Sequence, residues 1–141
     1  MNKFNAVIIN FVKSKLENDG LKLTPKESGR EGVDFLIGTN KLFLQSLDLD
    51  TIDRSAKIVK RDLGELQDNL FLILVLIIEE EPRMVYIIPS KDLSQSDSDI
   101  FISNDVSLMP SLSNWEIRIS VHTIPKLAKY SLENMLDKLK T

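Results

Sequence analysis

Two polar residues on a predicted hairpin have side-chain oxygens that could take part in chemistry. Asp34 lies in the apolar segment Val33–Ile37, and Gln45 lies in the next apolar segment, Lys41–Leu47. The short sequence Gly38–Asn40 between them is typical of a hairpin turn, so the two segments are expected to be neighbouring antiparallel strands. Hard divalent cations prefer oxygen ligands, which a carboxylate and a carboxamide both supply.

The elements that would position this hairpin are predicted from apolar spacing. A helical stripe predicts a helix from Asn2 to Asp19, and Gly20 is a natural C-terminal stop. The run Leu70–Ile78 predicts a central strand buried on both faces, against which Met84–Ser90 pairs back. A last helix is predicted from Pro125 to Lys140. The buried face of this helix is expected to hold Ala128, Leu132, Met135, Leu136 and Leu139.

Shorter elements fill the rest of the chain. An extended stretch is expected at Ala56–Val59, a helical turn from Asp62, and a solvated loop at Lys91–Asp99. The segment Asn114–His122 alternates between apolar and polar residues, which predicts a strand. Its apolar side is expected to hold Trp115, Ile117, Ile119 and Val121. The order of elements predicts a single α/β domain over residues 1–141, with a mixed central sheet flanked by N-terminal and C-terminal helices.

With these elements in place, the chain resembles the PD-(D/E)XK nuclease superfamily, and more loosely its small bacterial members of unassigned function. The resemblance covers roughly the first ninety residues. It rests on the opening helix, the hairpin segments GVDFLIG and KLFLQSL, and the strand LFLILVLII. It implies a restriction-endonuclease-like core and hydrolysis of a phosphodiester by water activated on one or two divalent cations, usually Mg²⁺.

The resemblance assigns roles by position. Asp34 matches the motif aspartate, and Gln45 matches the (D/E) position, so both would be metal ligands. Leu47 stands where the family has a lysine, which would polarise the attacking water and offset charge in the transition state. The acid that the family carries on its first helix is also missing, since Glu17 is late in the helix and off the apolar stripe. The resemblance therefore implies a degenerate active site.

A displaced lysine is the alternative. Lys41 shares a strand face with Gln45 but lies four residues away, which is roughly 13 Å along a strand and too far to share a metal. Lys57 or Lys60 could return on a neighbouring strand. In that case Asp34, Gln45 and Lys57 would be the catalytic residues and Mg²⁺ the cofactor; otherwise no cofactor is expected.

Composition limits the other classes of function. The chain has no cysteine and one histidine, which excludes disulfides, thiolate zinc sites and multi-histidine metal sites. Met1–Asn10 lacks the pattern of a secretory signal. The longest apolar run, Leu70–Ile78, is too short to span a bilayer as a helix, so a cytoplasmic protein with no membrane partner is expected.

The charge pattern gives weaker indications. A formal net charge of -3 argues against a surface coated for nucleic acid. A local basic face could track a phosphate backbone, and it would consist of Lys13, Lys15, Lys22, Lys26 and Arg30. Acidic residues lie among these positions in the sequence, which favours a solvated face instead. Asp48, Asp50 and Asp53 are expected to form a solvated turn, Glu79–Glu81 an exposed hairpin tip, and His122 a surface residue.

Three hypotheses for function follow from the sequence. The first is a non-catalytic binding or interaction module that keeps the nuclease-like fold. The second is a divalent-metal-dependent DNA endonuclease with a displaced lysine. The third is a homodimer or larger homo-oligomer in which a sheet edge, or the hairpin strand VYIIPS, pairs with a copy of itself. The missing lysine separates the first two, and an exposed apolar patch would favour the third.

Overall fold

Two β-sheets form the centre of the computed structural model, which describes residues 3–25, 35–51, 54–95 and 99–140. The larger sheet has five strands in the order β1 (Thr24–Pro25), β2 (Phe35–Ile37), β3 (Asn40–Asp48), β5 (Leu70–Ile78) and β6 (Glu81–Pro89). The smaller sheet has three strands in the order β4 (Ser55–Val59), β8 (Asn114–Arg118) and β7 (Phe101–Asn104). The smaller sheet is antiparallel throughout, and β3 and β5 form the parallel pair of the larger one.

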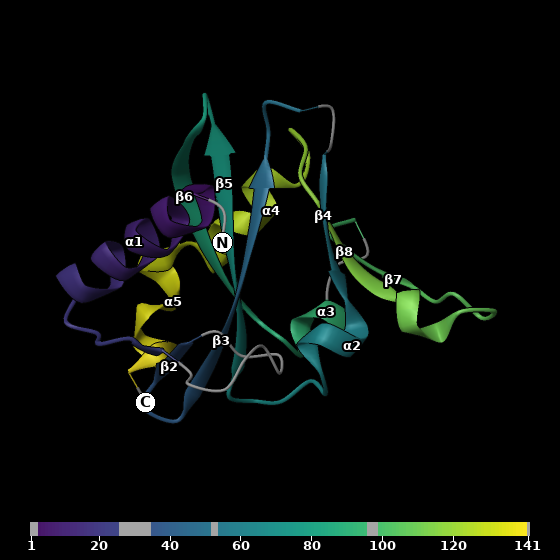
Figure 1. Ribbon diagram of the computed structural model, residues 1–141, viewed down its shortest axis with the longest axis horizontal. Coiled ribbons are helices and arrows are strands. Elements are labelled where there is room, and N and C mark those ends of the chain that lie inside the picture. The colour runs from purple at the N-terminus through teal and green to yellow at the C-terminus, as the bar shows by residue number, and fades with distance from the viewer. Residues whose placement is uncertain (1–2, 26–34, 52–53, 96–98, 141) are drawn as a thin grey trace.

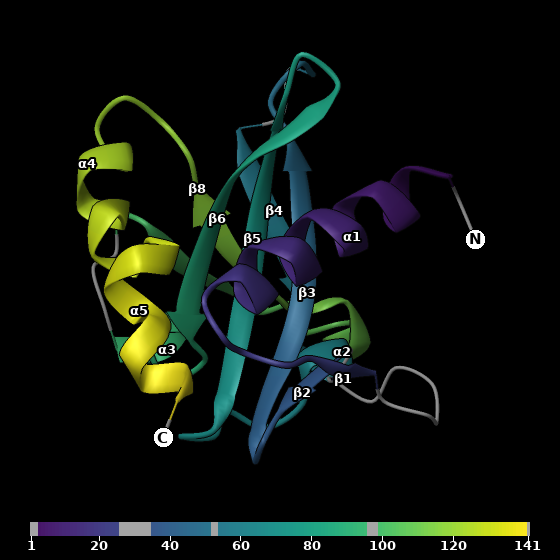
Figure 2. The ribbon, with the colours of Figure 1, turned by 90° about the vertical axis from the view of Figure 1, so that its left-hand side faces the viewer.

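The two faces of the larger sheet are covered by different kinds of structure. Figure 1 shows α1 (Lys3–Asn18) and α5 (Leu132–Leu139) to the left of this sheet and the smaller sheet to its right. Figure 2 looks onto the left-hand face, which α1 crosses diagonally while α5 lies beside β6. The mixed α/β class with N-terminal and C-terminal helices on a central sheet is therefore confirmed. The cover on the second face, however, is a sheet and not a helix.

Strand β5 is the centre of the core, as its continuous apolar run predicts. Its residues from Leu70 to Ile77 are all buried, and it pairs with β3 on one side and β6 on the other. Leu74, in the middle, has no exposed surface. One cluster of buried apolar side chains includes both Leu74 and Ile117 of β8, so the two sheets share a hydrophobic core.

The hairpin predicted at the start of the larger sheet is present. β2 and β3 are antiparallel, Ile37 pairs with Asn40, and Gly38 turns the chain with a φ of 60° that suits glycine. The buried Asn40 donates a hydrogen bond of 3.0 Å from Nδ2 to the carbonyl of Leu139, which ties the end of α5 to the start of β3. Asp34 lies outside the described residues.

Helix α1 buries one stripe and ends where the sequence predicts. Ile8, Val12 and Leu16, spaced four residues apart, are buried. Helical spacing also predicts Val7 on the buried stripe, but this side chain is 48% exposed. At the C-terminus the N–H of Leu21 donates to the carbonyl of Leu16 and the N–H of Gly20 to that of Glu17, both at 3.0 Å. With Gly20 at a φ of 86°, this is a Schellman motif.

The prediction of one continuous C-terminal helix is wrong. The chain forms three pieces, namely α4 (Ile124–Leu127), the 3₁₀ turn η2 (Ala128–Tyr130) and α5. Ser131 is extended, with ψ at 153°, and it bridges Tyr86 at the edge of β6. This break changes the phase of the buried side chains, so Leu127 and Tyr130 are buried while Ala128 is exposed.

Strand β8 is shorter than the alternating pattern predicts. It ends at Arg118, and Val121, expected on the apolar side, is 80% exposed. A turn stops the strand, because the Thr123 hydroxyl accepts a hydrogen bond from the N–H of Ser120 and donates one to the carbonyl of Arg118. The remaining short elements are α2 (Lys60–Leu63), α3 (Asp92–Gln95) and η1 (Pro110–Leu112). Helix α3 replaces part of the expected solvated loop because Leu93 is buried.

Candidate functional site

The position of the missing lysine is part of the hydrophobic core. Leu47 is 7% exposed and pairs in register with Leu76 of β5. Gln45, two residues earlier on the same strand face, is half-buried beside Leu74. Its Nε2 donates a hydrogen bond of 3.2 Å to the carbonyl of Ser46, so the amide is held by its own strand. Leu47 is part of the hydrophobic core, and the partners of both residues in register on β5 are leucines.

The two candidate replacement lysines lie at the smaller sheet. Lys57 is exposed on β4, directly across from Glu116 of β8. Lys60 begins α2, and its Nζ lies 4.1 Å from the centre of the Trp115 ring. Lys60 also forms an ion pair of 2.7 Å with Asp105. The described contacts of Lys57 and Lys60 are therefore with the smaller sheet and its connections, whereas Gln45 belongs to the larger one.

Within the described ranges, no group of three or more His, Asp or Glu side chains is arranged to hold a metal ion. This finding does not extend to a site that includes Asp34, which is outside those ranges.

Two lysines of the alternative basic face have local partners. Lys13 pairs with Glu17 at 3.9 Å, and the ammonium of Lys15 lies 5.4 Å from the centre of the Phe11 ring.

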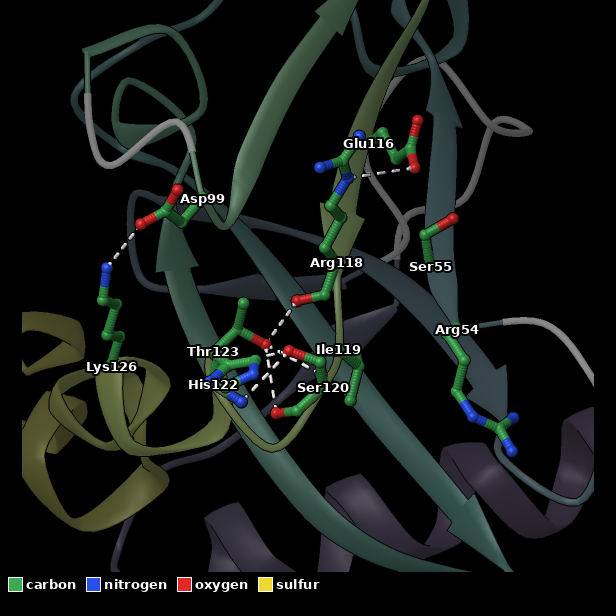
Figure 3. Close-up of a pocket in the computed structure, with 10 residues that line it drawn as sticks. All are labelled: Arg54, Ser55, Asp99, Glu116, Arg118, Ile119, Ser120, His122, Thr123 and Lys126. Atoms are coloured by element: carbon green, nitrogen blue, oxygen red, sulfur yellow. Dashed lines mark hydrogen bonds and ion pairs between the residues drawn. The ribbon is translucent and has the colours of Figure 1, made fainter.

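A pocket of about 740 Å³ lies at the end of the smaller sheet where β8 turns into α4. Figure 3 shows its lining side chains, which come from β4 and the residue before it, from β8, from the following turn, from α4 and from the segment before β7. They are Arg54, Ser55, Asp99, Glu116, Arg118, Ile119, Ser120, His122, Thr123 and Lys126. The lining thus contains three cationic side chains and two carboxylates in a chain whose net charge is -3.

The floor of this pocket is a turn fixed by side-chain hydrogen bonds. The Ser120 hydroxyl oxygen accepts the N–H groups of His122 and Thr123, both at 3.2 Å. The Thr123 hydroxyl in turn accepts the N–H of Ser120 at 2.9 Å and donates to the carbonyl of Arg118 at 2.8 Å. Thr123 is buried, so these bonds hold the backbone firmly while the imidazole of His122 remains exposed as predicted.

The carboxylates of the pocket are held by other groups of the protein. Asn104 donates a hydrogen bond of 2.9 Å to Glu116. This bond lowers the pKa of Glu116; burial opposes the effect, and a hydrogen bond from Ser55 and the nearby charges of Lys57 and Arg118 add to it. On the other side of the pocket, Lys126 and Asp99 form an ion pair of 2.8 Å between α4 and the segment before β7 (Figure 3).

Among the cationic side chains of the pocket, Arg118 has the weakest described contacts through its charged group. Its side chain is 57% exposed, and its closest described carboxylate contact joins Nε to Oε2 of Glu116 at 3.8 Å, which is longer than a hydrogen bond. Arg54 differs, since its Nη1 donates to the carbonyl of Thr51 at 2.5 Å. Sequence reasoning missed this pocket. Alternation along the strand predicts that Glu116 and Arg118 lie on its polar side. No local pattern in the sequence shows that Asp99 and Lys126 lie beside them.

Asp50, one residue of the expected solvated turn of aspartates, has a structural role, and Asp53 lies outside the described residues. The carboxylate of Asp50 accepts the N–H groups of Glu79 at 2.9 Å and Glu80 at 2.8 Å. These two residues form the exposed β5–β6 turn, and both have positive φ values, 54° and 64°, which non-glycine residues rarely adopt. The bonds from Glu79 and then Glu80 lower the pKa of Asp50. Asp50 therefore stabilises a turn that lacks the glycine such turns prefer.

One apolar surface is exposed at the end of the smaller sheet remote from the larger one. The connection from β7 to β8 carries Leu108, Met109 and Leu112, which are 94%, 55% and 51% exposed. Figure 1 shows this connection projecting from the right-hand end of the molecule. By contrast, the edge of β6, which was the other expected surface for self-pairing, is bridged at Tyr86 by Ser131.

The fold defines a mixed α/β protein built on two sheets. The sequence matches no protein-family model, and no curated protein matches it significantly. No helix in the described part of the chain is long and apolar enough to cross a membrane. The restriction-endonuclease-like core and the roles of Asp34, Gln45 and Lys57 remain predictions from the resemblance.

Proposed function

We propose that the chain is a non-catalytic binding module with a PD-(D/E)XK nuclease-like fold. The observation that carries this proposal is the burial of Leu47 at the position where the superfamily has its lysine. Catalysis there needs a cation beside the metal and water around both. An apolar side chain, paired in register with Leu76 in the hydrophobic core, supplies neither.

The described contacts of Lys57 and Lys60 support the same proposal. A displaced lysine has to reach the metal that Asp34 and Gln45 would hold. Lys60 is instead bonded to Ser103 and Asp105 and packed on Trp115. Lys57 projects from the smaller sheet opposite Glu116. Loss of one preorganised charge at a transition state costs about a hundred- to a thousand-fold in rate, so residual hydrolysis is expected to fall below routine detection.

A DNA cleavage assay tests this proposal. Purified wild-type protein and the variant Asp34→Ala are incubated with supercoiled and linear DNA in Mg²⁺ and in Mn²⁺. Neither protein is expected to cut, while an active metal-dependent nuclease in parallel shows that the assay works. Cleavage by the wild type that Asp34→Ala abolishes would overturn the proposal and establish the endonuclease alternative. Lys57→Ala and Lys60→Ala would then identify the displaced lysine.

A homo-oligomeric interaction protein is the second candidate, and the exposed side chains of Leu108, Met109 and Leu112 favour it. Light scattering after size exclusion gives the mass of the wild type. If copies associate through this surface, Leu108→Ser lowers the mass to that of one chain. The matched control is Val121→Ser, since Val121 is also apolar and 80% exposed but lies elsewhere. A wild type that remains a single chain at high concentration rejects this candidate.

A further inference from the structure

We propose that the pocket at the end of the smaller sheet binds a small anionic ligand through a phosphate or carboxylate group, with Arg118 as the main contact. The inference rests on the proposal that the chain is a binding module, and it assigns that module a site and a ligand chemistry. The site is distinct from the family positions, because Gln45 and Leu47 belong to the larger sheet.

The balance of charge in the pocket favours an anion. Its two carboxylates are already neutralised or hydrogen-bonded within the protein, Asp99 by Lys126 and Glu116 by Asn104 and Ser55. Once the Lys126–Asp99 pair is set aside, the described lining carries the guanidinium groups of Arg54 and Arg118 and the carboxylate of Glu116, which is an excess of one positive charge. In an acidic chain with a net charge of -3, this local excess of positive charge is the reverse of the average surface.

Arg118 supplies the donor geometry. Its terminal guanidinium nitrogens have no hydrogen-bond partner among the described residues, and more than half of the side chain is exposed to solvent. A guanidinium presents parallel N–H groups that match two oxygens of a phosphate or a carboxylate. An anion at this position would accept hydrogen bonds from the terminal guanidinium nitrogens, which donate none to the described residues.

The turn below Arg118 adds further donors. Ser120 accepts two backbone N–H groups through its hydroxyl oxygen, so its own hydrogen is available to donate. His122 also lines the pocket, with its ring exposed. Because the hydrogen bonds of Ser120 and Thr123 already fix the turn, a ligand would bind there with little cost of ordering the backbone.

The size and lining of the pocket favour a small molecule over a nucleic acid. A volume of about 740 Å³ lies within the range of pockets that hold metabolites and cofactors. No Phe, Tyr or Trp is among the lining residues that the structure describes. Proteins that bind single-stranded nucleic acid usually stack bases on such side chains. The expected ligand is therefore a phosphorylated or carboxylated small molecule.

Calorimetric titration with inorganic pyrophosphate and, separately, with citrate tests this inference. The wild type is compared with Arg118→Ala and with Arg61→Ala. The matched control Arg61→Ala removes another exposed guanidinium, which lies on α2 outside the pocket. Arg118→Ala is expected to fold, because the side chain is largely exposed and Glu116 keeps its bond to Asn104. Equal melting temperatures of the three proteins check this point.

The wild type and Arg61→Ala are expected to bind at least one of the two anions equally well, and Arg118→Ala about ten- to a hundred-fold more weakly. Arg118→Lys, which keeps the charge and loses the fork, should fall between them. Binding of pyrophosphate alone identifies a phosphate ligand, and binding of citrate alone a carboxylate ligand. No binding at millimolar anion, or equal binding by wild type and Arg118→Ala, overturns the inference. The DNA cleavage assay on the same preparation tests the proposed function separately, since cleavage would overturn that proposal and leave the anion result intact.

Discussion

Leu47→Lys introduces the lysine that the resemblance to nucleases implies at this position, and we expect it to destabilise the protein without creating an enzyme. Leu47 is 7% exposed, and its neighbour in register, Leu76, is 1% exposed. Removing the apolar burial of a leucine costs about 1.5–3 kcal/mol. Placing an ammonium group in this site adds several kcal/mol, of which the flexible stem of lysine recovers a part by reaching toward solvent.

The expected loss is therefore about 3–6 kcal/mol, a large part of the roughly 5–15 kcal/mol that stabilise a typical domain. Urea denaturation followed by circular dichroism measures it directly. Leu47→Met is the matched control, since methionine has a similar length and no charge and should cost less than about 1.5 kcal/mol. The reasoning is refuted if Leu47→Lys is as stable as Leu47→Met. If Leu47→Lys also cleaves DNA with Mg²⁺, the site is wet and poised for catalysis.

Three further perturbations test other parts of the structure. Leu74→Asp should leave no folded protein, because an unpaired buried charge costs several kcal/mol, whereas Val121→Asp, at a position 80% exposed, should melt as the wild type does. Asp50→Ala should lower the stability at neutral pH. The pKa of Asp50 is lowered in the folded state, so its contribution to the free energy of unfolding is lost as the pH falls through that pKa. The difference in stability between Asp50→Ala and the wild type should therefore disappear in acid. Lys60→Met should cost about 1 kcal/mol and change the emission of Trp115, the single tryptophan; unchanged emission would contradict the ring contact.

The parts of the fold that the sequence predicts correctly are those that local pattern determines. The apolar run Leu70–Ile78 has to be buried on both faces, and Gly20 and Gly38 stop a helix and turn a hairpin in the conformations expected of them. The errors have tertiary causes. Ser131 leaves the helical conformation to bridge Tyr86 of a strand far away in the sequence, and no local pattern contains that contact.

The candidate site is less predictable than the fold, because its parts meet only after the smaller sheet has formed. β4 and β8 are adjacent in that sheet although more than fifty positions separate Ser55 from Arg118, its partner in register. Alternation places Glu116 and Arg118 on the polar side of β8. It does not show that Asn104 and Ser55 hold Glu116 by hydrogen bonds, while Arg118 has only an ion pair of 3.8 Å with the same carboxylate.

The location of the pocket separates the question of catalysis from the question of binding. The resemblance to nucleases is carried by the first part of the chain, and its motif positions Gln45 and Leu47 belong to the larger sheet. Most of the pocket is built by later residues, from Asp99 to Lys126, on the smaller sheet and the turn that follows it. The burial of Leu47 in the core stabilises the larger sheet and leaves the end of the smaller sheet where β8 turns into α4 unaffected. The proposed lack of hydrolysis and the proposed anion binding depend on different strands, so each is tested without the other.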